Sequence, residues 1–262
     1  MRLMVNFGKG LTITTSWDDG HPMDLRVAEL LTRYGLPGTF YVPLSNSRPT
    51  LSTAEIRGLS QQFEIGAHTV NHVRLTALAD SEAQEQVTDS KKQLEDILGK
   101  PCSIFCFPGG SYSKIHFRML REAGFVGART VKLLSLERPC AIDEIAVIPT
   151  TIQAYPHTAV SYLRNAAKRF SVGAVWNLLQ GGSTTGWSAL AGELLERAAY
   201  IGGVFHLWGH SWEIEENGQW RVLDETLAAI SKYSKCASLL TNTELCSDVG
   251  KTANNPKPAL VS

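Results

Sequence analysis

Two short motifs in this chain combine residue types that can bind a metal ion and move a proton. An acid pair ends the apolar run of Ser16-Trp17-Asp18-Asp19-Gly20, and two histidines stand four positions apart in His68-Thr69-Val70-Asn71-His72. Imidazoles at i and i+4 lie on one face of a helical turn, and a carboxylate from a separate strand end can complete a three-ligand set. Such a set leaves one position for water, as a hydrolytic catalyst requires. Taken separately, the motifs are also compatible with a solvated acidic turn and a surface turn.

The composition indicates one globular α/β domain. The 262 residues are 44% hydrophobic and 19% charged, so the chain can bury a sizeable core. Lys+Arg 25 against Asp+Glu 25 leaves no net charge, which argues against nucleic acid as an obligate partner. Five cysteines, an odd number without a Cys-x-x-Cys pair, indicate reduced thiols rather than a zinc framework.

The apolar segments indicate a cytoplasmic protein. The N-terminal apolar stretch breaks at Gly8, before the apolar core of a signal peptide could form. Elsewhere, no stretch approaches the roughly 20 apolar residues that span a bilayer. We therefore expect cytoplasmic localisation and no membrane span, while the oligomeric state stays open.

Strand-like and helix-like segments alternate along the chain. Strands are predicted at residues 11–16, 39–42, 63–67, 103–107, 125–129, 145–151, 203–208 and 237–241. Helices are predicted at residues 24–34, 52–62, 81–98, 114–123, 158–170, 188–200 and 223–233, the second of them opening with the capping box Ser52-Thr53-Ala54-Glu55. This alternation predicts a parallel sheet, open or closed into a barrel.

In these motifs the sequence resembles the polysaccharide deacetylases, also called family 4 carbohydrate esterases. Ser16-Trp17-Asp18-Asp19-Gly20 resembles their first motif, usually Thr-Phe-Asp-Asp-Gly, and residues 68–72 match their second, His-Ser/Thr-x-x-His. Phe107-Pro108-Gly109-Gly110-Ser111-Tyr112 resembles the third, substrate-groove motif. The resemblance covers roughly residues 11–245 and implies an α/β fold, a distorted (β/α) barrel with about seven parallel strands. We expect a catalytic domain over residues 1–246 and a disordered tail over residues 247–262, which has the composition of such tails.

The resemblance also implies a role for each chemical group of the first two motifs. Asp19, His68 and His72 would bind one divalent metal ion, and Asp18 would act as the general base. Zinc is the expected metal, although nickel, cobalt or iron suit the same ligands. A bound cation acidifies its water, while a carboxylate outside the ligand set can take the proton as that water attacks a carbonyl carbon.

The residues expected to bind substrate lie in the third motif and near a late strand. Pro108, Gly109 and Gly110 form a turn from which a backbone N–H would help to hold the oxyanion. Trp208 and Trp212 offer faces on which a sugar ring can stack, with core packing as the alternative role of any single tryptophan.

A general acid is also required, because an amine leaves poorly unless it is protonated. His206 and His210 are the candidates, since family members carry a histidine at the end of a late strand. His210 is favoured because His210-Ser211-Trp212-Glu213 resembles the His-Pro-Trp-Glu form of some relatives, whereas His206 lies inside an apolar run. His116 and His157 are expected at ordinary surface positions.

Two features depart from the family pattern. Many relatives carry an arginine in the third motif that steadies the base, but the nearest matching residue here is Cys106, and no Asp-x-x-Asp-Trp fourth motif is found. Arg129, Lys132 and Asp143 are possible substitute partners of the base, and the sequence does not choose among them.

These observations favour a metal-dependent hydrolase that removes an N-acetyl group, through a linear amide C–N bond, from an amino sugar or a sugar-containing small molecule. Two alternatives are a hydrolase of the same superfamily acting on a non-sugar amide or cyclic imide, and a catalytically silent carbohydrate-binding domain. A separate base beside the ligand set speaks against the silent domain, which has no need of one.

Overall fold

A computed structural model describes residues 10–157, 186–247 and 249 of the chain. Its strands are β1 (Thr12–Asp18), β2 (Thr39–Val42), β3 (Glu64–Ala67), β4 (Ile104–Cys106), β5 (Gly127–Arg129), β6 (Cys140–Ile142), β7 (Ile145–Ile148), β8 (Ile152–Gln153), β9 (Val204–His210) and β10 (Ser238–Leu239). Its α-helices are α1 (Asp24–Tyr34), α2 (Thr53–Leu59), α3 (Asp80–Leu98), α4 (Lys114–Glu122), α7 (Trp187–Ile201), α8 (Ser211–Glu216), α9 (Trp220–Ser231) and α10 (Asn242–Cys246). Two short 3-10 helices are η1 (Leu75–Ala77) and η2 (Pro108–Gly110).

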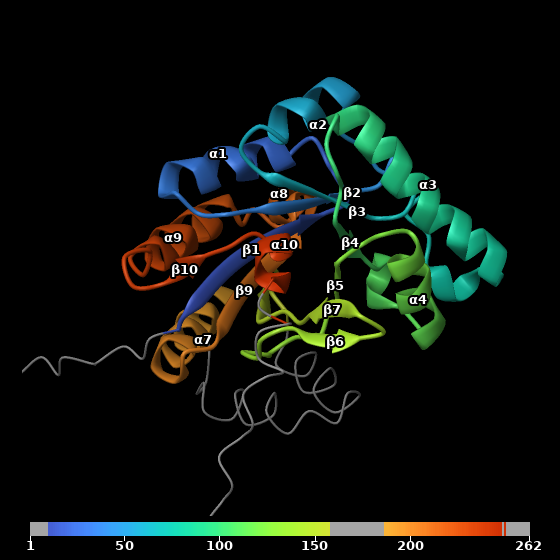
Figure 1. Cartoon of the computed structure of the whole chain (residues 1–262). Coiled ribbons are helices and arrows are strands. Elements are labelled where there is room, and N and C mark those ends of the chain that lie inside the picture. The colour runs from blue at the N-terminus through green and yellow to red at the C-terminus, as the bar shows by residue number, and fades with distance from the viewer. Residues whose placement is uncertain (1–9, 158–185, 248, 250–262) are drawn as a thin grey trace, which may run out of the picture.

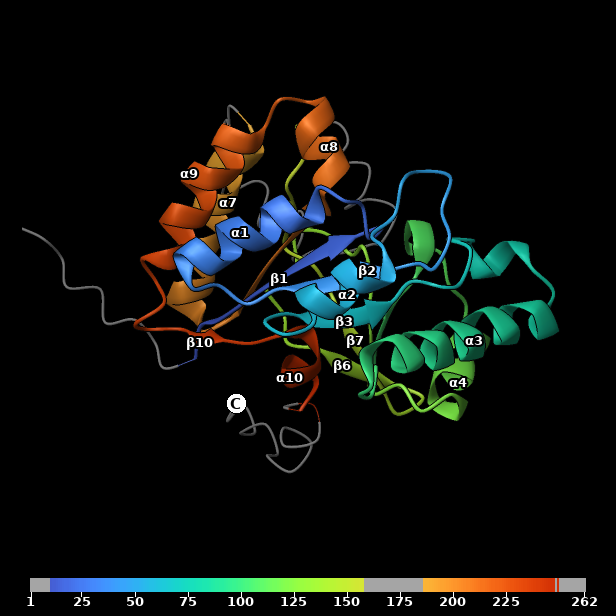
Figure 2. The same cartoon turned by 90° about the horizontal axis from the view of Figure 1, so that it is seen from above.

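The strands form a single curled sheet, with helices packed around it (Figures 1 and 2). Their order is β6-β7-β5-β4-β3-β2-β1-β9-β8, with β10 beside the start of β1, and every pairing except that of β6 with β7 is parallel. The expected distorted (β/α) barrel is confirmed, in the form of a half-barrel. The described residues carry ten strands rather than about seven, because the two-residue strands β8 and β10 and the antiparallel β6 belong to the same sheet.

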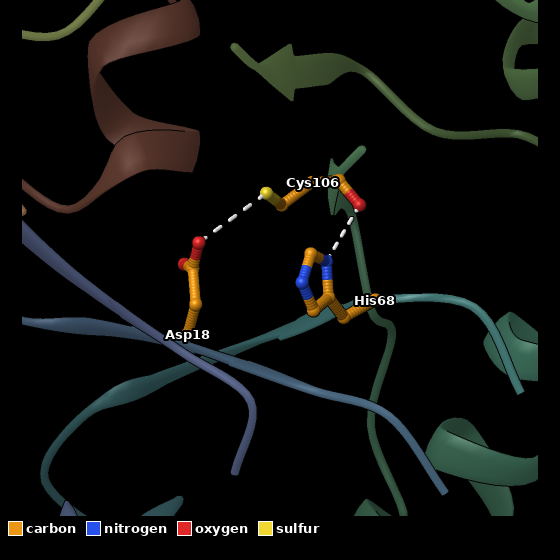
Figure 3. A group of neighbouring side chains, drawn as sticks. All are labelled: Asp18, His68 and Cys106. Atoms are coloured by element: carbon orange, nitrogen blue, oxygen red, sulfur yellow. Dashed lines mark hydrogen bonds between the residues drawn. The ribbon is translucent and has the colours of Figure 1, made fainter. Parts of the chain in front are cut away.

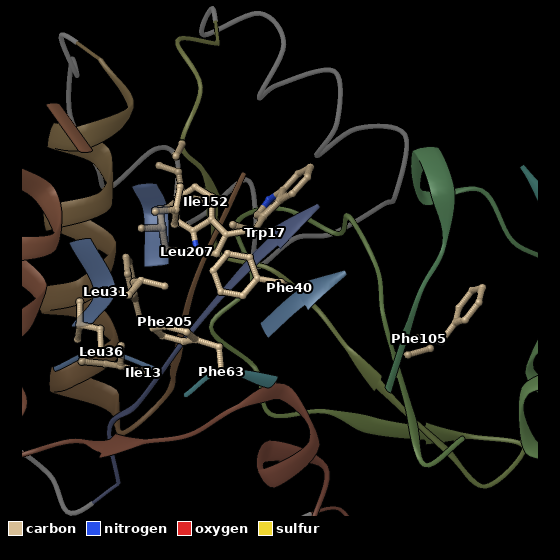
Figure 4. Close-up of a cluster of buried hydrophobic side chains, with 14 of the residues drawn as sticks. Ile13, Trp17, Leu31, Leu36, Phe40, Phe63, Phe105, Ile152, Phe205 and Leu207 are labelled. Carbon is tan, nitrogen blue, oxygen red and sulfur yellow. The ribbon is translucent and has the colours of Figure 1, made fainter. Parts of the chain in front are cut away.

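The centre of the sheet is a continuous apolar core. All seven residues of β1 are buried, as expected of a parallel strand covered on both faces. Trp17 of β1 packs in one cluster with Phe40 of β2, Leu207 of β9 and Leu31 of α1 (Figure 4). This packing fixes the strands whose carboxyl ends carry the two sequence motifs.

Most helices and strands lie close to the positions that local sequence patterns predict. Helix α2 begins at the expected capping box, with the Ser52 hydroxyl accepting from the Glu55 N–H and the Glu55 carboxylate accepting from the Ser52 N–H. Four short elements, β6, β8, α8 and α10, were not predicted, and β9 continues two residues beyond its expected end to His210. The helix predicted at 158–170 lies outside the described residues, as does all but Ser247 and Val249 of the predicted tail.

The strand register brings the motif residues to one edge of the sheet. Asp18 lies directly opposite His210 in the β1–β9 pairing, and Cys106 lies opposite Arg129 in the β4–β5 pairing. His68 follows the last residue of β3. Because parallel strands end at the same edge, five chemically active side chains gather there from five different strands. Among the described residues, no helix is long and apolar enough to cross a membrane.

Candidate active site

The adjacent acids Asp18 and Asp19 take different directions because the chain leaves the strand between them. Strand β1 ends at Asp18, and Asp19 follows in the left-handed region with φ 80°. This conformation is uncommon outside glycine, and such backbone strain concentrates at functional sites. The turn continues through Gly20 at φ 58°. The two carboxylates therefore contact different neighbours, as two separate chemical tasks require.

The histidine pair lies in a loop, which corrects the expectation of a helical turn. After β3, residues 68–74 have no helical structure, and Thr69 (φ 65°) and His72 (φ 52°) are both left-handed. The Thr69 hydroxyl accepts from the Val73 N–H at 3.1 Å, which ties the loop across its base. The two imidazole rings still converge, with centroids 4.9 Å apart. His68 and His72 are therefore neighbours, as their i,i+4 spacing predicts, but they lie in a loop and not on a helical turn.

Asp19, His68 and His72 form a compact group of three potential metal ligands. The Oδ1 atom of Asp19 lies 3.0 Å from Nε2 of His72 and 3.6 Å from Nε2 of His68. This oxygen is buried and accepts no well-directed hydrogen bond from any described residue. One buried carboxylate oxygen facing two imidazole nitrogens is a donor set that suits zinc and similar divalent cations. The residues therefore fit the metal that the sequence predicts.

The charge states of these groups also suit cation binding. Burial lowers the pKa of His68 to about 4, so its imidazole is neutral. Its Nδ1 donates to the Cys106 carbonyl at 2.8 Å, which leaves a lone pair on Nε2. Burial alone would raise the pKa of Asp19, but the hydrogen bond from His72 and the positive charge of His210 hold it well below its usual value.

A second group, Asp18, His68 and Cys106, is also close enough to be considered as ligands (Figure 3). Two observations disfavour it. Burial raises the pKa of the Cys106 thiol well above its usual value. The guanidinium of Arg129 binds Asp18, so a positive charge already sits beside that carboxylate. The group around Asp19 is therefore the better candidate for a metal site.

Arg129 is the partner of Asp18 that the sequence left open. Its side chain is completely buried and donates from Nη2 to Oδ1 of Asp18. The guanidinium also lies over the rings of Trp208 and Tyr41, at 4.7 and 5.2 Å from their centroids. The other two candidates pair elsewhere, Lys132 with Glu137 and Asp143 with Arg121.

Of the two candidate acids, His210 lies in the site and His206 lies in the core. The Nε2 atom of His210 is 4.0 Å from an oxygen of Asp18 and from one of Asp19, and its Nδ1 lies 2.6 Å from Oε2 of Glu213. Burial would lower the pKa of His210, but the bond to Glu213 and the charge of Asp18 raise it to about 9. His206 is fully buried and bonds to Ser16 and to the Pro149 carbonyl.

Three further side chains join the site without having been predicted there. Glu213 accepts from Gln153 at 2.9 Å, and Gln153 accepts in turn from Nε2 of His157 at 2.8 Å. His157 therefore lies half-buried in the wall of the site rather than at an ordinary surface position, and His116 is buried. The resemblance of residues 210–213 to His-Pro-Trp-Glu was a signal for Glu213, whereas Gln153 and His157 had none.

A cavity of about 390 Å³ opens over these groups. Gly109, Trp208 and Trp212, all expected to bind substrate, line it, whereas Pro108 is buried and Gly110 packs against Val131. The full lining is Asp18, Asp19, His68, His72, Phe107, Gly109, Val131, Leu133, Gln153, His157, Trp208, His210, Trp212 and Glu213. Its size is at the small end of ligand pockets, and it combines apolar walls with a few convergent polar groups.

Comparison with known proteins finds relatives of part of this chain. Residues 8–128 match the polysaccharide deacetylase family. The peptidoglycan-N-acetylglucosamine deacetylase of Bacillus cereus is 28% identical over 116 residues, which are 43% of this chain and 53% of that protein. The matched segments cover only about half of the length of the curated relatives.

Two solved structures share the fold along nearly the whole chain. A Mycobacterium smegmatis protein assigned as a polysaccharide deacetylase is 16% identical, with 97% of this chain and 95% of that chain covered and a TM-score of 0.69. Puue allantoinase is 11% identical, with 95% and 93% covered and a TM-score of 0.66. Over residues 8–128 the chain therefore matches the polysaccharide deacetylase family, and beyond them the likeness to these structures is one of fold.

Proposed function

We propose that this protein is a metal-dependent hydrolase that removes the N-acetyl group of an amino sugar or of a sugar-containing small molecule. The observation that carries the proposal is the separation of tasks around one cavity. Asp19, His68 and His72 converge as ligands, while Asp18 and His210 stand outside that set on the same cavity. A binding module has no need of a carboxylate and an imidazole in these two positions. We take residues 1–246 as the catalytic domain.

In this proposal Asp19, His68 and His72 would hold one divalent cation, with zinc as the first choice. When bound, such a cation acidifies a water molecule and polarises the acyl oxygen. The remaining chemistry belongs to the protein. Asp18 takes a proton from the attacking water, and Arg129 holds that carboxylate in place. The backbone N–H of Gly109 is the proposed oxyanion donor, because that of Gly110 already donates to the Phe107 carbonyl.

The bond changes balance with these two residues. The water oxygen bonds to the acyl carbon while Asp18 accepts a water proton. The C–N bond then breaks as Nε2 of His210 gives its proton to the departing nitrogen, and acetate and a free amine are released. Glu213 fixes the imidazole through Nδ1, which supports protonation at Nε2 on the side facing the acids. Proton exchange with solvent restores both groups.

The walls of the cavity support a single amino-sugar unit as substrate. Trp208 and Trp212 supply aromatic surface, and Gln153 and His157 supply polar atoms beside it. The Bacillus cereus relative, named for N-acetylglucosamine in peptidoglycan, supports an N-acetyl sugar as the first substrate class to test. A cyclic amide is the second candidate, because Puue allantoinase has the same fold over 95% of this chain.

The test is a mass-spectrometric screen of the zinc-loaded full chain against N-acetylated monosaccharides, short N-acetylated oligosaccharides and cyclic amides. We expect loss of one acetyl group from an N-acetyl sugar and no change in mass of the cyclic amides. Addition of one water to a cyclic amide, without acetate release from any sugar, would move the assignment to the second candidate. An Asp18→Asn control identifies contaminating hydrolases, since their activity would persist in it.

A further inference from the structure

The indole of Trp212 contacts the metal-ligand set directly as well as lining the cavity. Its Nε1–H donates to Oδ2 of Asp19 at 2.8 Å. The other oxygen of the same carboxylate, Oδ1, faces the two imidazoles of His68 and His72. We infer that Trp212 is a positioning residue for the metal, because it fixes which oxygen of Asp19 binds the cation. The inference rests on the proposed metal site.

The geometry gives this bond a specific consequence. A carboxylate free to rotate can present either oxygen, or both, to a cation. With Oδ2 held by the indole, Asp19 presents Oδ1 alone, and the ligand set stays at one carboxylate oxygen and two nitrogens. Hydrogen bonds to ligating groups orient them and tune metal affinity. The backbone of Asp19 has left the strand and is left-handed, with φ 80°. The strand before it therefore does not fix the direction of the Asp19 side chain.

Trp212 is itself held by a charged neighbour. The Arg48 guanidinium lies 3.6 Å from the centroid of its ring. Nη1 of Arg48 also binds Glu216, one helical turn further along α8, at 2.7 Å. A cation on the ring face is attracted by the aromatic electrons and draws them from the N–H, which makes the indole a better donor to Asp19. The first turn of α8 therefore orients the metal carboxylate through Trp212 and the acid His210 through Glu213.

The chain contains a closely matched control. Trp220 also donates its indole N–H to a carboxylate, that of Glu215, and an arginine, Arg26, lies over its ring at 4.1 Å. Trp220 is not among the residues that line the cavity. The Trp220→Phe variant therefore removes the same kind of bond, made in this case to an exposed carboxylate, without touching the proposed ligands.

The experiment measures the affinity of the full chain for Zn²⁺ by competition with a chromophoric chelator, together with the melting temperature of the metal-free protein. Trp212→Phe keeps an aromatic ring but lacks the N–H. We expect it to bind Zn²⁺ about 10- to 100-fold more weakly than the wild type. Trp220→Phe should bind Zn²⁺ as the wild type does. Both variants should show similar small changes in metal-free melting temperature.

Four results would overturn the inference. Equal Zn²⁺ affinity of the wild type and Trp212→Phe would remove the positioning role while leaving the metal site intact. An equal loss of affinity in Trp212→Phe and Trp220→Phe would indicate a general effect on folding. A wild type that binds no Zn²⁺ would remove the proposed metal site and this inference together. Trp212→Tyr provides a second protein without the indole N–H, and failure of both Trp212 variants to fold would show a purely structural residue.

Discussion

Arg129 on β5 donates to Asp18 at the end of β1, although the two residues are 111 positions apart. Strands β2, β3 and β4 lie between β1 and β5 in the sheet. The guanidinium can reach Asp18 only because the sheet curls, so that its side chain crosses the inside of the half-barrel. Cys106, the neighbour of Arg129 across β4 and β5, places only a thiol near Asp18, with its sulfur 3.9 Å from Oδ2.

Removing this arginine should destabilise the fold and impair the base. In Arg129→Met, the buried carboxylate of Asp18 loses its partner, and breaking a buried ion pair typically costs about 3 to 5 kcal/mol. We expect a loss of that size in the free energy of unfolding, measured by urea titration, with a fall in turnover of the folded fraction. Arg118→Met is the matched control, because its pair with Glu122 is exposed and worth about 0 to 1 kcal/mol. Equal effects of the two variants would contradict the assignment of Arg129.

Mutations should distinguish the proposed general base Asp18 from the proposed metal ligands Asp19, His68 and His72. Asp18→Asn should keep the bound metal and lose turnover by at least about 100-fold, because it removes only a proton acceptor. His72→Ala should lose both metal and turnover, since it removes a ligand. Elemental analysis measures the bound metal, and acetate release measures turnover. Loss of metal in Asp18→Asn with His68 and His72 intact would exchange the roles of Asp18 and Asp19.

The proposed acid should matter in proportion to the leaving group. His210→Ala should lower turnover on an N-acetyl sugar by about 10²- to 10⁴-fold, with a much smaller effect on an activated aryl acetate, whose phenolate leaves without a proton. Glu213→Gln should show the same selectivity more weakly, because it removes the charge that holds the proton on His210. Similar losses on both substrates would mean that His210 does not protonate the leaving group.

His206 should make the fold sensitive to acid. Burial and the charge of Arg129 lower the pKa of His206 from its ordinary 6.5 to about 3. As the pH falls below 6.5, this histidine is protonated in the unfolded chain but not in the folded chain. The free energy of unfolding therefore falls until the pH reaches the pKa of His206 in the folded chain. Between pH 7 and pH 5 this contribution is about 2 kcal/mol. The His206→Gln variant should be less stable than the wild type at pH 7. Between pH 7 and pH 5, however, its free energy of unfolding should fall by about 2 kcal/mol less than that of the wild type. Urea unfolding measures the free energy of unfolding of both proteins at pH 7 and pH 5. An equal loss in the two proteins between these pH values would contradict this account.

The parts of the site that depend on local pattern could be predicted from the sequence. Short strand-like runs located β1 and β3, and the position of Asp18 and His68 at their ends followed from them. The left-handed geometry of Asp19 and His72 could not be predicted, because the modest preference of Asp and His for this region does not mark a particular position in the chain. The helical expectation for residues 68–72 failed for that reason.

The partners of the site residues depend on tertiary geometry. Arg129 reaches Asp18 through the curvature of the sheet, and no sequence spacing encodes a distance across a half-barrel. Gln153 enters through β8, a two-residue strand too short to produce a periodic pattern. Trp212 was expected only as a stacking surface, and its bond to Asp19 depends on how α8 packs against the end of β1.

The central claim, a metal-dependent deacetylase with Asp19, His68 and His72 as ligands, is tested most directly by acetate release from an N-acetyl sugar before and after metal removal. The full chain is stripped with a chelator, shown by elemental analysis to hold no metal, and then reloaded with Zn²⁺ in steps. We predict no acetate release from the stripped protein and recovery that saturates at one Zn²⁺ per chain, with no recovery in His72→Ala. Full turnover by the stripped protein, or equal recovery in His72→Ala, would contradict the account.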